Sequence, residues 1–264
     1  MLELTNITKT FNAGTINEKV ALNNLSLTLQ DGEFVTVIGG NGAGKSTMLN
    51  TVAGVFFADE GKITIDSKDV TRLPEYRRAP FIGRVFQDPM MGTAASMGIE
   101  ENLALALRRG KSRGLRWGIS AKERAEYRDK LASLGLGLEE RMTAKVGLLS
   151  GGQRQALTLL MATLQKPKLL LLDEHTAALD PQTAAKVLEA TEEIVGRDKL
   201  TTLMITHNMK DAIAHGNRLV MMYDGRIVID VAGEEKKKLT VEKLLGMFAT
   251  VSGSDEADDT LLLS

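Results

Sequence analysis

Nine consecutive residues have the composition and spacing of a loop that binds phosphate. The stretch GGNGAGKST fits the pattern G-x-x-x-x-G-K-[ST] and lies between a strand-like run and a helix-like run. Glycines let backbone N–H groups surround phosphate oxygens, Lys45 carries a charge suited to the β- and γ-phosphates, and the Ser46 hydroxyl suits Mg²⁺. The residues predicted to contact phosphate are Gly39, Gly40, Asn41, Gly42, Ala43, Gly44, Lys45, Ser46 and Thr47.

Two acids follow a run of four leucines in the stretch LLLLDE. The leucines predict a buried strand, and ligands of open α/β sheets bind at the carboxyl ends of strands. Asp173 is suited to Mg²⁺, directly or through water, and Glu174 to polarising a water molecule that attacks the γ-phosphate. Two solvated acids at a strand end are the alternative for this motif alone, and the phosphate loop favours the catalytic interpretation.

A third candidate is the helix start LSGGQRQ, Leu149 to Gln155. Ser150 is a good N-cap, and two glycines at a helix entrance cost stability unless something must approach the backbone closely. A helix N-terminus offers free N–H groups and the positive end of a dipole, so a ligand bound there would be an anion. Alone, the pattern is equally compatible with a capped structural helix.

The elements that must position these groups alternate between strand and helix patterns. Strand-like runs dominate up to the phosphate loop, and the character becomes helical at about 90–165, where Ser120 and Glu123 form a capping box. After residue 166 strands and helices alternate again, which predicts an α/β fold with a mostly parallel, buried sheet. We expect a main domain over 1–245 and an acidic, loosely ordered tail over 246–264.

Composition excludes several classes of protein. The net charge of −1 gives no global sign of nucleic-acid binding, and the absence of cysteine excludes disulfides and cysteine-bound metals. No basic region with an apolar run opens the chain, and no apolar run approaches the ~18 residues of a membrane span. We therefore expect a soluble, cytoplasmic chain that reaches any membrane only through a partner.

Together, the phosphate loop, LSGGQRQ, LLLLDE, AALD and ITHN resemble the ATP-binding cassette (ABC) ATPase family over residues 1–245. The resemblance implies a P-loop NTPase core, an N-terminal antiparallel β subdomain and an inserted α-helical subdomain. It also implies head-to-tail pairing of two cassettes on ATP, in which the helix start of one subunit faces the γ-phosphate held by the other. The residues acting in trans would be Ser150, Gly151, Gly152 and Gln153, the glycines being needed because a side chain would collide with the nucleotide.

The same resemblance assigns four further positions. Phe11 would stack on adenine, and Gln87 in RVFQDP would contact Mg²⁺ and the attacking water. His207 in ITHN would contact the γ-phosphate, and Asp180 in AALD would couple the two nucleotide sites. The chain departs from the family at two positions: His175 stands where the family commonly has proline, and Ala177 stands where it commonly has serine. Neither departure removes a group assigned to chemistry.

A stand-alone cassette of this kind most resembles the ATPase subunit of a bacterial transporter that hydrolyses ATP with Mg²⁺. The sequence around RVFQDP and LLLLDEHTAALDP is similar to the sequences of an importer subgroup linked to tryptophan or tyrosine uptake. The resemblance implies separate transmembrane permease subunits, a substrate-binding lipoprotein, and a place on the inner face of the cell membrane. A soluble non-transport ATPase and an exporter subunit stay open as alternatives. A P-loop kinase or GTPase would have no use for LSGGQ or His207.

Overall fold

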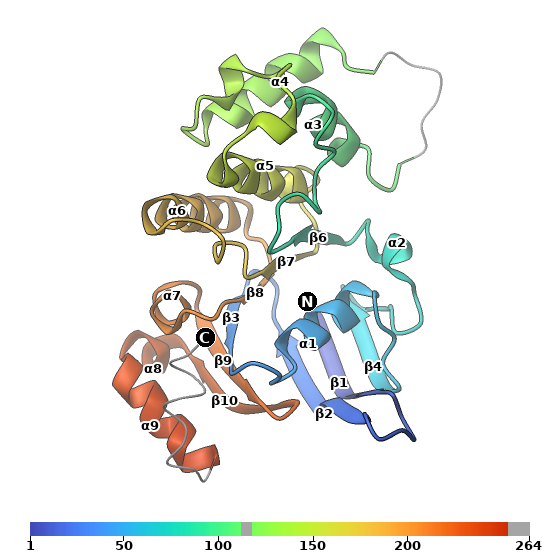
Figure 1. The fold of residues 1–264 in the computed structure, drawn as a ribbon, viewed down its shortest axis with the longest axis vertical. Coiled ribbons are helices and arrows are strands. Elements are labelled where there is room, and N and C mark those ends of the chain that lie inside the picture. Colours follow the sequence, from blue (N-terminus) through green and yellow to red (C-terminus); the bar gives the residue numbers. More distant parts are fainter. Residues whose placement is uncertain (112–117, 253–264) are drawn as a thin grey trace.

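The structure is a computed structural model that describes residues 1–111 and 118–252. Its N-terminal part is an antiparallel sheet with the strand order β2-β1-β4-β5 (Figure 1). The strands are β1 (Leu2–Phe11), β2 (Lys19–Leu29), β4 (Glu60–Ile65) and β5 (Lys68–Asp69). This is the antiparallel β subdomain that the sequence predicted.

A second sheet has the order β10-β9-β3-β8-β7-β6, and only the β9–β10 pair is antiparallel. Its strands are β3 (Phe34–Ile38), β6 (Ile82–Val85), β7 (Leu169–Asp173), β8 (Thr202–Ile205), β9 (Arg218–Tyr223) and β10 (Arg226–Ala232). Ile205 pairs with Val37 on one side and with Asp173 on the other. The carboxyl ends of β3, β7 and β8 therefore meet at one edge, and the predicted α/β fold with a mostly parallel sheet is confirmed.

Both faces of this sheet are buried at β7. Alternate leucines of β7 belong to different cores: Leu169 and Leu171 pack on the side of α1 (Lys45–Ala53) and the N-terminal sheet. Leu170 and Leu172 pack on the side of α6 (Pro181–Asp198). Burial on both faces explains why β7 is continuously apolar rather than alternating.

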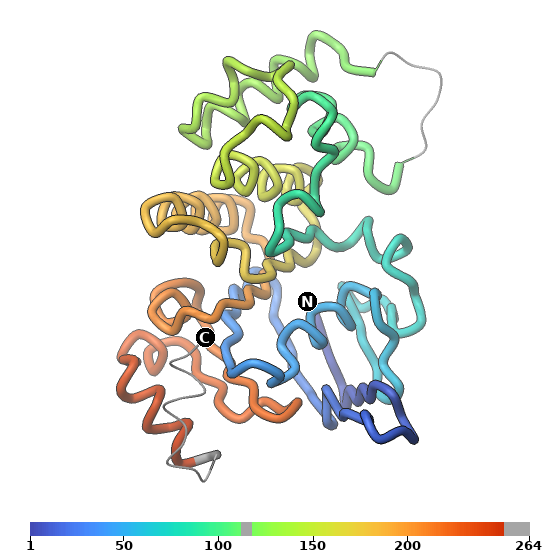
Figure 2. Tube along the Cα trace, viewed as in Figure 1, coloured from blue at the N-terminus to red at the C-terminus, as the bar shows by residue number. Residues whose placement is uncertain are grey.

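The helical part lies between β6 and β7 in the sequence. It contains α3 (Ile99–Leu107), α4 (Ala121–Ala132), α5 (Gly151–Thr163) and the short 3₁₀ turns η1 (Leu138–Glu140) and η2 (Val146–Leu148). Its helices share a core of their own that includes Leu103, Tyr127 and Leu157. Figure 2 shows the chain leaving the sheet after β6 and returning at β7, with these helices gathered at one end of the molecule.

The remaining helices are α2 (Glu75–Arg78), α7 (Met209–Ala214), α8 (Gly233–Lys237) and α9 (Val241–Ser252). The expectation of a loosely ordered tail from residue 246 is wrong at its start, because α9 continues through Ser252. Leu244 and Phe248 of α9 are buried against the β9–β10 hairpin, which gives this segment a packed apolar face. The rest of the predicted tail, 253–264, lies outside the described residues. In the described part of the chain, no helix is both long and apolar enough to cross a membrane.

Candidate active site

The loop between β3 and α1 has the shape that glycine makes possible. Gly39 has φ +150°, and a Cβ there would lie 2.3 Å from the carbonyl oxygen of Met222. Gly44 has φ +99°, and a Cβ there would lie 2.4 Å from the carbonyl oxygen of Ala21. In the part of the chain that the structure describes, no side chain caps the start of α1, so its first N–H groups have no side-chain acceptor there. Free amides at a helix N-terminus behind a glycine-rich turn fit a phosphate group.

Lys45 lies within this loop. Its ammonium donates to the carbonyl oxygens of Gly39 at 2.6 Å and Gly40 at 3.2 Å, and the residue is 7% exposed. Burial lowers the pKa of Lys45, while Glu174 and Asp173 act in the opposite direction. The cation is thus held at the loop and faces the two acids, while Ser46 beside it is exposed.

Glu174 and His207 are brought together because β7 and β8 are neighbours. Nδ1 of His207 lies 4.0 Å from Oε2 of Glu174. Glu174 has the left-handed φ of +43°, and its N–H donates to the carbonyl oxygen of Ile205 at 3.0 Å. The backbone therefore turns directly after Asp173, a conformation that non-glycine residues seldom adopt outside constrained sites.

Asp173 has a cationic neighbour that the sequence analysis missed. Nη2 of Arg84, on β6, lies 3.6 Å from Oδ2 of Asp173. Burial raises the pKa of Asp173, and Arg84 opposes that rise. The available signal was an arginine within the apolar run FIGRVF, since a charge inside a strand of a buried sheet requires a partner.

A second missed cation is Lys19. Its ammonium nitrogen lies 3.2 Å from the position that a Cβ of Gly42 would occupy. Lys19 also pairs with Phe11 across the β1–β2 ladder, so the two side chains share one face. Phe11 itself packs edge-on against Phe56, with ring centroids 5.3 Å apart. The structure thus places the aromatic ring assigned to adenine beside a cation that reaches the phosphate loop.

The start of α5 is capped as predicted. The hydroxyl of Ser150 accepts from the N–H of Gln153, and the Gln153 side chain accepts from the N–H of Ser150. Ser150 and Gly151 are exposed, whereas Gly152 is buried against Thr183 of α6. The expectation that both glycines are needed only for the nucleotide is therefore incomplete, because Gly152 is required by packing within the chain.

The structure keeps the start of α5 apart from the phosphate loop of the same chain. Figure 1 places α5 with the helical part and α1 beside the N-terminal sheet. Asp180 is exposed at the N-cap of α6, and hydrogen bonding to the side chain of Thr183 and then to its N–H, at 3.0 Å, lowers the pKa of Asp180. Gln87 is exposed in the loop after β6, where the buried Gln155 of α5 donates to the neighbouring carbonyl oxygen of Phe86.

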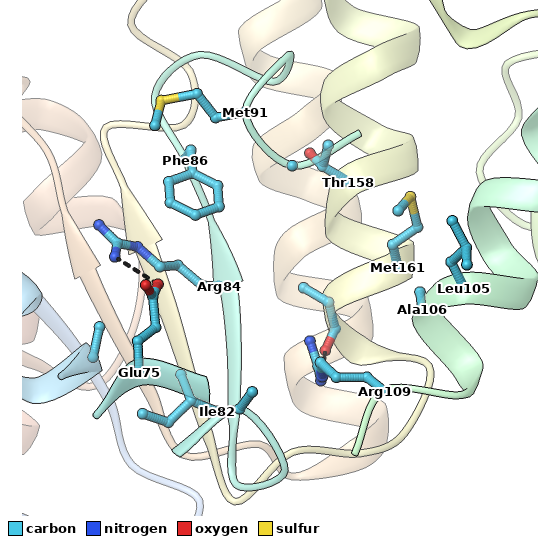
Figure 3. Close-up of a pocket in the computed structure, with 14 residues that line it drawn as sticks. Glu75, Ile82, Arg84, Phe86, Met91, Leu105, Ala106, Arg109, Thr158 and Met161 are labelled. Atoms are coloured by element: carbon cyan, nitrogen blue, oxygen red, sulfur yellow. Dashed lines mark hydrogen bonds and ion pairs between the residues drawn. The ribbon is translucent and has the colours of Figure 1, made fainter. Parts of the chain in front are cut away.

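A groove of about 410 Å³ opens between the sheet and the helical part (Figure 3). Its wall is apolar at Phe86, Met91, Leu105 and Met161 and charged at Glu75, Arg84 and Arg109. Burial lowers the pKa of Arg109, whose Nε has no hydrogen-bond acceptor among the described residues. Met90 is exposed nearby, whereas Met97 does not line the groove.

The chain is similar to several known proteins. A family model described as "ABC transporter" matches residues 22–177. The chain is 46% identical to a Tyrosine transport ATP-binding protein of Clostridioides difficile (strain R20291), over 94% of this chain and 98% of that protein. It is 37% identical to the Methionine import ATP-binding protein MetN of Rhizobium johnstonii, over 79% of this chain. It is 32% identical to the Spermidine/putrescine import ATP-binding protein PotA of Pasteurella multocida, over 93% of this chain.

The match spans 56% of the length of that methionine protein and 63% of that polyamine protein. Among solved structures, a dimeric ATP-binding cassette, MJ0796, bound to ADP and Pi in a post-hydrolysis state is 31% identical, with a TM-score of 0.75. That similarity covers 88% of this chain and 98% of the other. A nucleotide-free cassette from an ABC transporter is 26% identical over 98% of both chains, again with a TM-score of 0.75.

Proposed function

The chain belongs to the ATP-binding cassette transporter family, and from this premise we propose which residues perform its chemistry, where its permease docks and what it helps to import. It binds and hydrolyses ATP as the energising subunit of an importer, and the names of its relatives describe ATP-binding proteins of tyrosine transport, methionine import and spermidine/putrescine import. The observation that carries the residue assignments is the meeting of Lys45, Asp173, Glu174 and His207 at one edge of the parallel sheet.

Each of these groups has a role that its position supports. Lys45 and the free amides of the loop bind the β- and γ-phosphates, because both offer positive charge to the same anion. Glu174 accepts the proton of the attacking water or polarises it, since its carboxylate projects from the strand end. His207, 4.0 Å from Glu174, contacts the γ-phosphate and helps to fix that carboxylate.

Mg²⁺ is the second component that the site fits. The exposed hydroxyl of Ser46 and the carboxylate of Asp173 are oxygen donors, and Mg²⁺ prefers few protein ligands together with phosphate oxygens and water. The ion would neutralise charge on the phosphates. Gln87, on the exposed loop after β6, would reach the ion and the attacking water when that loop moves towards the nucleotide.

Two chains would complete each ATP site. Ser150 and Gly151 expose the α5 N-terminus away from the phosphate loop of their own chain, so this helix end can meet a γ-phosphate only in another subunit. Gln153 would hold this helix start in shape through its hydrogen bonds with Ser150. Asp180, the exposed N-cap of the adjacent α6, would couple the two nucleotide sites. Phe11 and the loop residues would hold the nucleotide in each subunit before pairing.

We assign the groove in Figure 3 to the permease. Its apolar wall includes the exposed side chain of Met91, and apolar surface rimmed by charge is typical of protein interfaces. Tyr76 and Met90, the chain neighbours of the lining residues Glu75 and Met91, are exposed too. The groove includes Met91 from the segment 88–117 that follows Gln87. It excludes Met97, and residues 112–117 of that segment lie outside the described residues.

An aromatic amino acid is the cargo we favour, because the similarity to the tyrosine transport protein spans nearly the whole of both chains. The permease and a substrate-binding lipoprotein would select that cargo, and the chain would lie on the inner face of the membrane, where ATP is available. An exporter subunit or a soluble ATPase without a permease are the alternatives.

The test is co-purification followed by transport. The chain should co-purify with a permease encoded beside it, and vesicles holding the complex and its lipoprotein should take up labelled tyrosine or tryptophan with ATP. Labelled methionine and spermidine serve as competing cargoes. ATP hydrolysis with no membrane partner would support the soluble alternative, and outward transport the exporter.

A further inference from the structure

Arg84 lies between the groove and the nucleotide site. Nη1 is 3.8 Å from Oε1 of Glu75, which lines the groove, and Nη2 is 3.6 Å from Oδ2 of Asp173. Nη2 also donates to Oδ1 of Asn50 at 2.7 Å, and the guanidinium lies 4.5 Å from the centroid of the Phe86 ring. Figure 3 shows Glu75 and Arg84 facing one another in the groove.

The two carboxylates compete for a single cation. The Arg84 side chain is 12% exposed and that of Asp173 is 16% exposed, so water screens their attraction poorly. The Glu75 side chain is 55% exposed at the rim of the groove, so an incoming partner can reach it. Nε of Arg84 has no acceptor among the described residues, so the side chain is not fixed by a full set of hydrogen bonds.

We propose that Arg84 is a positioning residue that couples the docking groove to the Mg²⁺ site, by sharing its guanidinium between Glu75 and Asp173. This inference rests on the proposed function of both sites. A partner that binds Glu75 leaves Arg84 to Asp173, whereas a partner that draws Arg84 into the groove frees the Asp173 carboxylate for Mg²⁺. The occupancy of the groove thereby changes the metal affinity of the nucleotide site.

A purely structural role for Arg84 predicts something different. If Arg84 only neutralised a buried carboxylate, its loss would weaken folding and ATP binding alike, and Glu75 would have no influence at the metal site. The coupling instead requires that changes at Glu75 and at Arg84 act in opposite directions, and that the effect of Glu75 disappears when Arg84 is absent.

The experiment measures the dissociation constant of ATP by calorimetry, once in EDTA and once in Mg²⁺. The quantity compared between variants is the dissociation constant in EDTA divided by that in Mg²⁺. Arg84→Met should raise this ratio about fivefold, because the unpaired Asp173 repels ATP until Mg²⁺ is present. Glu75→Gln should lower it about twofold, because Arg84 then remains with Asp173. The double variant should match Arg84→Met, and Arg84→Lys should lie near the wild type.

Glu126→Gln on α4 is the matched control, since it removes one exposed carboxylate charge within the helical part and should leave the ratio unchanged. Glu75 is at the surface, so its variant tests the coupling even if Arg84→Met does not fold. An unchanged or raised ratio in Glu75→Gln overturns the inference, as does an effect of Glu75→Gln that persists without Arg84. If the wild type binds no ATP, the proposed function fails and the inference fails with it.

Discussion

Gly152 and Thr183 are packed so closely that a Cβ on Gly152 would lie 2.0 Å from Cγ2 of Thr183. This contact joins the start of α5 to the first turn of α6, whose N-cap is Asp180. A Cβ on Gly151 would meet only Cδ2 of Leu179, at 3.2 Å, the end of a flexible side chain. The two glycines therefore have different roles. Gly152 allows the starts of α5 and α6 to pack against one another, whereas Gly151 leaves its backbone accessible to an external ligand.

Gly152→Ala should destabilise the chain by about 1–3 kcal/mol, the usual cost of overpacking. Thr183→Ser removes Cγ2 and leaves Cβ at 3.5 Å, so the double variant should recover most of that loss. Urea unfolding of the two single variants and the double variant measures this, with Gly151→Ala as the control. If Gly152→Ala lowers the free energy of unfolding equally in the wild type and in Thr183→Ser, the contact between Gly152 and the Thr183 methyl group is unimportant.

Lys45→Ala should strongly reduce ATP hydrolysis and weaken ATP binding, because it removes the cation held at the loop by the carbonyl groups of Gly39 and Gly40. Loss of one preorganised charged donor lowers turnover by about 10²–10³-fold. The measurements are phosphate release and calorimetric ATP affinity, with Lys130→Ala on α4 as the control. Wild-type affinity and turnover in Lys45→Ala would refute the phosphate-loop assignment.

Glu174→Gln should form a dimer with ATP but not with ADP. Without the carboxylate the attacking water loses its base, so hydrolysis should fall by about 10²–10⁴-fold while nucleotide binding persists. Trapped ATP then joins two chains by mass action. Size-exclusion chromatography with light scattering should report the mass of a dimer in ATP and of a monomer in ADP.

Adding Gly151→Asp to Glu174→Gln should abolish this ATP-induced dimer, because an exposed carboxylate at the α5 start repels the γ-phosphate. ATP binding to the monomer should be retained. A double variant that still dimerises with ATP would place the γ-phosphate elsewhere than at this helix start.

Met91→Ser should reduce transport while leaving the basal ATP hydrolysis of the isolated chain unchanged, because Met91 lines the groove assigned to the permease. Met97→Ser is the matched control, since Met97 is half-buried and lies outside that groove. The measurement is ATP-driven uptake by the reconstituted complex. Equal transport by the two variants would count against docking at the groove.

His175 should make the fold sensitive to acid. The side chain is 2% exposed, its Nε2 lies 3.2 Å from Oγ1 of Thr191, and burial lowers its pKa from 6.5 to about 4. Above pH 6.5 both folded and unfolded chains keep the imidazole neutral. Between pH 6.5 and 4 only the unfolded chain takes up the proton, so the free energy of unfolding falls by about 1.4 kcal/mol per pH unit.

Urea unfolding at pH 7 and pH 5 tests this against His175→Gln, which keeps a polar group near Thr191 and cannot titrate. The wild type should lose more stability than the variant on acidification. The same pH dependence in both proteins would exclude His175 as the source.

Local patterns in the sequence were enough to predict the elements that carry most of the candidate site residues. LLLLDE gave a buried strand with acids at its end, and Ser150 and Ser120 gave two helix starts with the capping observed. β6 was missed because it is a four-residue strand that contains Gly83 and Arg84, neither of which is typical of an apolar strand. A Cβ on Gly83 would lie 2.5 Å from the carbonyl oxygen of Ala162, so tertiary packing requires that glycine.

Contacts between distant residues could not be predicted in the same way. Arg84 and Asp173 are 89 positions apart (173 − 84), and they meet only because β6 and β7 become neighbours. The ordered α9 was missed for a related reason. Its apolar residues Leu244 and Phe248 are buried only because the β9–β10 hairpin lies against them, and that contact cannot be predicted from the local sequence.

The pairing of β6 with β7 also sets an order on folding. Ile82 pairs with Leu169, 87 positions further along the chain (169 − 82), and among the described strands β6 has no other neighbour. Closing a flexible loop of that length costs about 4 kcal/mol in chain entropy, from (3/2)RT ln n. Because the helices between these strands share their own core, they can condense first and shorten the loop before β6 attaches. Arg84 then joins Asp173 only when β6 attaches, so under the coupling proposed above a chain whose helical part is unfolded would keep the phosphate loop but would not link ATP to a partner.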